Sequence, residues 1–130
     1  MNQKVLIAKD YAKQKHKGQK REVSGEDYYI HCLSVFNILK GVTSDEDILI
    51  AGLLHDIIED TDTEYTEIFN IFGVKVADLV NECTKPYETL RSREALMIKF
   101  ADMLHNASEH PKEEWIKRRC KMIKESKRLK

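Results

Sequence analysis

The stretch Leu-Leu-His-Asp-Ile-Ile-Glu-Asp-Thr, residues 53–61, places four ionisable side chains at the end of the most apolar segment of the chain. That segment, about residues 45–59, is apolar nearly all round, which predicts a helix in the centre of a helical bundle. Charged side chains there cost free energy unless a partner compensates them. On one continuous helix, His55 and Asp56 lie about 100° apart and can both reach one ion. We therefore predict that they are two ligands of a metal ion.

Glu59 and Asp60 follow one helical turn later, beneath His55 and Asp56 respectively. Their carboxylates would then be close enough to handle a water held by the ion, which is a catalytic role. The alternative is a pair of surface charges at the helix end, because Asp60 and Thr61 also begin a loop. The residues alone leave both interpretations open.

The segments on either side show helical spacing of their apolar residues. Further helices are expected at about residues 2–17, 28–40, 64–72, 74–83 and 91–107, with a last one from Pro111. No stretch alternates with the period of a strand, and no Ser/Gly linker divides the 130 residues. We therefore predict an all-α bundle of about six or seven helices that forms a single domain, residues 1–130.

Composition favours a soluble globular protein, with 42% apolar residues, 34% charged residues and a formal net charge of zero. No apolar run approaches the roughly 20 residues that span a bilayer, and the first residues lack the apolar core of a secretory signal. The three cysteines show no C-x-x-C spacing, which indicates reduced thiols. We expect a cytoplasmic protein with neither nucleic acid nor a membrane as partner. The basic final helix is interpreted as a solvated face, with nucleic acid, acidic lipid or a partner protein as the alternatives.

Two ligands cannot complete a coordination sphere, so other helices must contribute. Asp102 lies in a second apolar stretch, residues 97–104, where a buried aspartate needs a cation or several donors. It is the natural third ligand. A fourth ligand near a helix start would be His31, although a lone histidine on an apolar face is more often an ordinary core residue. In the loop before it, Lys20 and Arg21 are candidates for contacting an anionic ligand.

Five motifs in order make the chain resemble the HD hydrolase domain of Rel/SpoT-type alarmone enzymes and of small alarmone hydrolases. They are His-Lys-Gly-Gln-Lys-Arg at 16–21, Ser-Gly-Glu-Asp-Tyr at 24–28 with His31, the central motif at 53–61, Phe-Gly-Val-Lys-Val-Ala-Asp-Leu-Val at 72–80 with Thr-Lys at 84–85, and Lys-Phe-Ala-Asp-Met-Leu-His-Asn at 99–106. The resemblance covers most of the chain, from about Ala8 to Glu109.

The resemblance implies specific roles for these residues. The ligands of one divalent ion, usually manganese, would be His31, His55, Asp56 and Asp102. The catalytic pair would be Glu59 and Asp60, and the residues that contact the nucleotide would include Arg21 and Asn106. The implied reaction is metal-assisted removal of the 3′-pyrophosphate of (p)ppGpp, leaving GDP or GTP.

Some features keep other interpretations open. The stretch between Thr84 and Asp102 is much shorter than in most members of that family, which favours another nucleotide phosphate, such as the 2′-phosphate of NADPH, as substrate. A third interpretation is a nucleotide-binding HD domain without turnover, although the implied ligands and the pair Glu59 and Asp60 are all present. Zinc, iron and cobalt stay open as alternatives to manganese. The oligomeric state, a homo-oligomer included, is not predicted.

Overall fold

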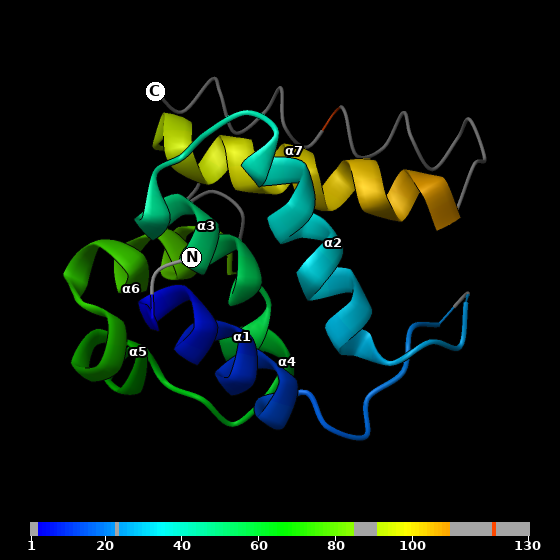
Figure 1. The fold of residues 1–130 in the computed structure, drawn as a ribbon, viewed down its shortest axis with the longest axis horizontal. Coiled ribbons are helices and arrows are strands. Elements are labelled where there is room, and N and C mark those ends of the chain that lie inside the picture. The colour runs from blue at the N-terminus through cyan, green and yellow to red at the C-terminus, as the bar shows by residue number, and fades with distance from the viewer. Residues whose placement is uncertain (1–2, 23, 85–90, 110–120, 122–130) are drawn as a thin grey trace.

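The computed structural model describes residues 3–22, 24–84, 91–109 and 121, and the named elements in this part of the chain are all helical. In order they are α1 (Gln3–Lys15), α2 (Tyr28–Lys40), α3 (Glu46–Leu53), α4 (Ile57–Asp60), α5 (Tyr65–Phe72), α6 (Val74–Glu82) and α7 (Arg93–Glu109) (Figure 1). The predicted all-α class is confirmed. The helix predicted from Pro111 lies outside the described residues, apart from Lys121, which is helical.

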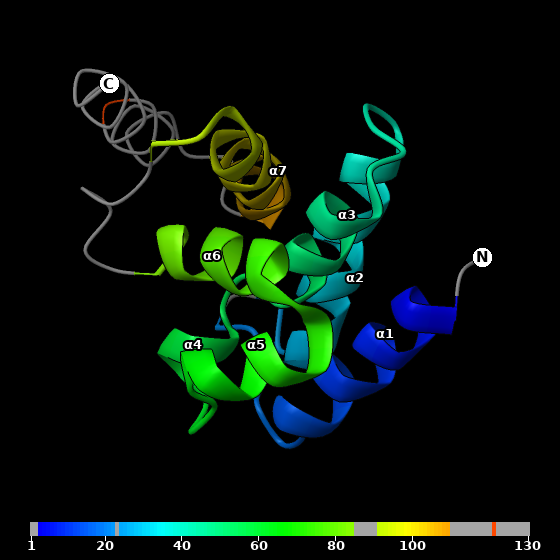
Figure 2. The same ribbon diagram turned by 90° about the vertical axis from the view of Figure 1, so that its left-hand side faces the viewer.

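The centre of the bundle is α3, as its apolar sequence predicts. It packs against α1, α2, α6 and α7, and every residue from Ile48 to Leu53 is buried. At Gly52 an added Cβ would overlap Cδ1 of Leu39, so glycine allows α2 to approach α3 closely. All seven described helices contribute apolar residues to one core. Figure 2 shows α6 between α5 and α7, and α6 also packs against the central helix α3.

The prediction of one helix over residues 45–59 is wrong, because the chain turns at Leu54, His55 and Asp56. α3 begins at the N-cap Asp45, whose Oδ1 accepts the N–H of Asp47 at 2.9 Å. It stops where Nδ1 of His55 bonds to the carbonyl oxygen of Gly52 at 2.8 Å, the acceptor that a continuing helix would offer to the N–H of Asp56. The chain therefore enters α4 from a turn, and Glu59 and Asp60 do not lie on the helix that precedes His55.

Within the described ranges, no helix is both long enough and apolar enough to cross a bilayer.

Candidate metal centre

Four side chains from three regions of the fold meet in the interior. His31 comes from the first turn of α2, His55 and Asp56 from the turn between α3 and α4, and Asp102 from the middle of α7. One ligand atom of each lies within 4.8 Å of the others. Nε2 of His31 is 2.8 Å from Oδ1 of Asp102, and Nε2 of His55 is 2.9 Å from Oδ2 of Asp56. The structure thus brings together the four ligands that the sequence predicts, which we call the metal cluster.

Both histidines turn Nε2 toward the cluster because Nδ1 is engaged elsewhere. Nδ1 of His55 bonds to the carbonyl of Gly52, and Nδ1 of His31 lies 2.7 Å from Nδ1 of His105. Partners of this kind fix the tautomer and the ring orientation of a metal-binding histidine. The hydrogen bond that ends α3 therefore also orients a candidate metal ligand.

Each carboxylate of the cluster also accepts a hydrogen bond from a residue outside the cluster, which we call an outer partner. Lys99, buried one turn before Asp102 on α7, donates from Nζ to Oδ2 of Asp102 at 2.9 Å. Nδ2 of Asn106 donates to Oδ1 of Asp102 at 3.1 Å. The hydroxyl of Tyr28 donates to Oδ2 of Asp56 at 2.5 Å. Neighbours on α2 and α7 thus hold both aspartates in place.

The electrostatics of the cluster favour an added cation. Burial disfavours charge on every one of these groups, and it lowers the pKa of His31. At His55 the carboxylates of Asp56 and Asp102 overcome burial and raise the pKa well above its ordinary value. Against the same burial, His55 above all lowers the pKa of Asp56 to about 2, while hydrogen bonds from His31 and His55 hold that of Asp102 well below its usual range. At this cluster, ionised carboxylates and nearby positive charge thus favour each other, which is the charge pattern that a bound metal ion would also satisfy.

The donor set fits a divalent ion. Two imidazole nitrogens and two carboxylate oxygens, all from buried or partly buried residues, suit a borderline-to-hard cation that retains open positions. The structure therefore contains a potential His/Asp metal site.

Glu59 and Asp60 lie on α4, at the surface beside the cluster. The pKa of Asp60 is raised first by partial burial and then by the negative charges of Asp56 and Glu59, so the three carboxylates are electrostatically close. Gln19 donates from Nε2 to the main-chain carbonyl of Asp60 at 2.8 Å. Neither Glu59 nor Asp60 belongs to the metal cluster itself.

Two of the three predicted nucleotide contacts meet at the C-terminal end of α7. Arg21 donates from Nη2 to Oδ1 of Asn106 and from Nε to Oε1 of Glu109 at 2.9 Å. We call Arg21, Asn106 and Glu109 the arginine cluster. Lys20 instead forms an exposed ion pair with Asp27.

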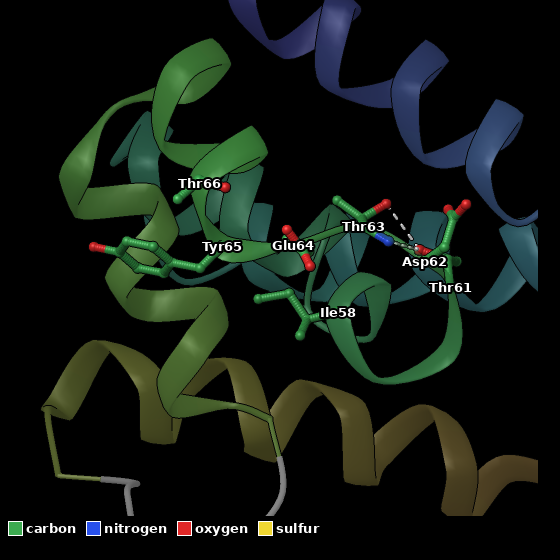
Figure 3. Close-up of a pocket in the computed structure, with 7 residues that line it drawn as sticks. All are labelled: Ile58, Thr61, Asp62, Thr63, Glu64, Tyr65 and Thr66. Carbon is green, nitrogen blue, oxygen red and sulfur yellow. Dashed lines mark hydrogen bonds between the residues drawn. The ribbon is translucent and has the colours of Figure 1, made fainter.

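A cavity of about 530 Å³ lies beside the loop that connects α4 and α5, and Ile58 and Glu64 are among its lining residues (Figure 3). Its other lining residues are Thr61, Asp62, Thr63, Tyr65 and Thr66. Because its charged lining is acidic, this cavity is unsuited to a phosphorylated nucleotide.

Four residues around these clusters received no role from the sequence. Tyr28, Lys99 and His105 lie inside the quoted motifs, so their positions in the motifs were an available signal. Glu109 carries no such signal, because 88 positions separate it from its partner Arg21. Only the fold brings those two side chains together.

An all-helical core around two histidines and two aspartates defines a helical domain with a candidate metal centre. A family model described as "HD domain" matches residues 8–124, and the chain belongs to this HD domain family.

Relatives of known name are similar to most of the chain. The chain is 47% identical over 83 residues to the guanosine-3′,5′-bis(diphosphate) 3′-pyrophosphohydrolase of Aquifex aeolicus, a match that covers 64% of this chain and 12% of that protein. It is 34% identical over 127 residues to the bifunctional (p)ppGpp synthase/hydrolase SpoT of Escherichia coli, covering 82% of this chain and 17% of SpoT. The chain therefore spans less than a fifth of either relative's length.

A solved structure supports the same fold. It is described as a metazoan ortholog of SpoT that hydrolyses ppGpp, and it superposes with a TM-score of 0.81 at 28% identity, covering 97% of this chain and 84% of the other.

Proposed function

We propose that this chain is a metal-dependent phosphohydrolase that removes the 3′-pyrophosphate of (p)ppGpp and releases GDP or GTP and pyrophosphate. The observation that carries the proposal is the convergence of His31, His55, Asp56 and Asp102 within 4.8 Å. The names of the relatives and of the structural neighbour support this substrate. The proposal takes residues 1–130 as one domain and places it in the cytoplasm.

The ion of this site is proposed to be Mn²⁺, held by the metal cluster. When bound, it would supply Lewis-acid polarisation of a phosphoryl oxygen and activation of water. The protein's own contribution is to orient the four ligands through the outer partners of both histidines and both aspartates.

Glu59 and Asp60 are the proposed catalytic pair. The attacking water bonds to the phosphorus that is attached to the 3′ oxygen. The bond between this phosphorus and the 3′ oxygen breaks, and the 3′ oxygen takes up a proton. A carboxylate beside the cluster can accept the proton of that water, and the raised pKa of Asp60 makes it a better base than an ordinary aspartate.

Substrate binding is assigned to Arg21 and Asn106, with Lys20 as a further cation for phosphate. An arginine next to an amide at the end of α7 suits recognition of an anionic, hydrogen-bonding ligand. The exposed ion pair of Lys20 with Asp27 leaves the lysine accessible to a phosphate that competes for it.

The test is pyrophosphate release from ppGpp by the purified protein with Mn²⁺. We expect turnover by the wild type and a loss of about 10²–10⁴-fold in Glu59→Ala, which should still bind one equivalent of metal. Bound metal without release of pyrophosphate would overturn ppGpp as the substrate, and the same assay with other nucleotide phosphates, NADPH included, would follow.

A further inference from the structure

Glu109 occupies the last described position of α7, where Arg21 from the loop between α1 and α2 contacts it. Its Oε1 accepts hydrogen bonds from both Nε and Nη2 of Arg21. Each of the two side chains is only 10% exposed. Such a charge-assisted contact, largely shielded from water, holds an arginine far more firmly than a surface ion pair does.

The second oxygen of Glu109 lies near His105, which in turn contacts the metal cluster. Oε2 lies 3.9 Å from Nε2 of His105, and the other ring nitrogen of His105 is 2.7 Å from Nδ1 of the ligand His31. Glu109 thus lies between the arginine expected to meet the nucleotide and the group that orients a metal ligand.

The contacts hold one edge of Arg21 and leave the other available. Nε and Nη2 are engaged by Glu109 and Asn106, and Cζ lies 5.4 Å from the centre of the Tyr28 ring. Nη1 has no hydrogen-bond partner within the described ranges. Without Glu109 the long arginine side chain would regain rotamers that it must give up when it meets a ligand.

We propose that Glu109 is a positioning residue, which holds Arg21 by its Nε–Nη2 edge so that Nη1 faces the anionic nucleotide. The identity of that nucleotide rests on the proposed function. The hold itself is a property of the ligand-free protein.

The experiment is a double-mutant cycle of Glu109→Ala and Arg21→Ala on ppGpp hydrolysis. In the wild-type background we expect Glu109→Ala to raise KM about tenfold and to change kcat by less than about twofold. In the Arg21→Ala background it should have no further effect, because Glu109 acts through Arg21. Glu109→Gln, which keeps an acceptor oxygen, should restore part of the lost affinity. Glu94→Gln, in the first turn of the same helix, is the matched control and should leave KM unchanged.

A rise in KM of equal size in both backgrounds would overturn the proposal, and so would an unchanged or lowered KM in Glu109→Ala. The same cycle on urea unfolding without nucleotide separates this proposal from the proposed function. Additive effects on unfolding would show that Glu109 does not hold Arg21, whatever the substrate is. Coupled effects on unfolding, together with a wild type that does not hydrolyse ppGpp, would support the positioning of Arg21 by Glu109 and overturn the assignment of ppGpp.

Discussion

The metal cluster and the arginine cluster both depend on α7, but they differ in where their positive charge comes from. In the arginine cluster, Arg21 neutralises Glu109 within the chain itself. In the metal cluster, two ionised carboxylates face two imidazoles, and the buried Lys99 offsets part of their charge. The arginine cluster is complete as it folds, whereas we propose that the metal cluster reaches its working state only when it binds an ion.

The largest effect is expected when one of the proposed metal ligands is removed. We expect Asp56→Ala to retain no stoichiometric Mn²⁺ after dialysis, and to lose turnover by more than about hundredfold. The reason is that a cluster without one of its four ligands cannot hold the ion. Metal analysis and the pyrophosphate assay measure the two losses. Full activity in this variant would break the assignment of the metal cluster.

The second prediction concerns metal addition without substrate. If Mn²⁺ at one hundred times its Kd binds only the folded chain, it should stabilise the wild type by about 2.7 kcal/mol. Arg21→Ala should show the same gain, since its cluster needs no ion, and Asp56→Ala should show none. Thermal unfolding with Mn²⁺ and with EDTA measures this, and equal gains in all three proteins would contradict the comparison.

Sequence reasoning located the metal cluster because burial of charge is costly wherever it occurs. His55, Asp56 and Asp102 could be selected as ligands on that ground, since each lies in an apolar stretch. His31 could not, because a lone histidine can be buried neutral at no such cost and has no carboxylate next to it, as His55 has in Asp56, so only the family resemblance selected it.

The helices followed periodicity closely, and α2 spans residues 28–40 as predicted. The break after α3 could not be predicted in the same way, because it depends on one side chain, His55, bonding to the carbonyl of Gly52. The partnership of Arg21 and Glu109 was also beyond sequence reasoning. Charged positions far apart in the sequence show no pattern that marks them as neighbours.

A smaller effect is expected from the outer partner of Asp56. Tyr28→Phe removes the hydroxyl that donates to Oδ2 of Asp56, and should weaken Mn²⁺ affinity and turnover by about tenfold each. The matched control is Tyr11→Phe, because the buried hydroxyl of Tyr11 has no hydrogen-bond partner within the described ranges. Mn²⁺ titration of both variants tests the claim, and equal affinities would show that Asp56 is held without Tyr28.

The smallest effect is the pH dependence of the arginine cluster. Although burial opposes the shift, the hydrogen bond and charge of Arg21 lower the pKa of Glu109 in the folded chain. The unfolded chain therefore takes up the proton first as pH falls. The stability that the pair contributes is complete above the ordinary glutamate pKa of about 4.3, and is lost as pH falls through the lower folded value.

To isolate the contribution of this ion pair, the free energy of unfolding in urea is compared between wild type and Glu109→Gln, in EDTA, from pH 7 to pH 3. The aspartates of the metal cluster titrate in both proteins, so their contribution cancels in the difference. At pH 7 the wild type should be more stable by about 1 kcal/mol, because the glutamine side chain keeps a neutral hydrogen bond and loses only the excess strength of a charged one. That difference should shrink steadily below about pH 4.3. A difference that stays constant to pH 3 would mean that Glu109 contributes through packing alone, and that Arg21 is not held by charge.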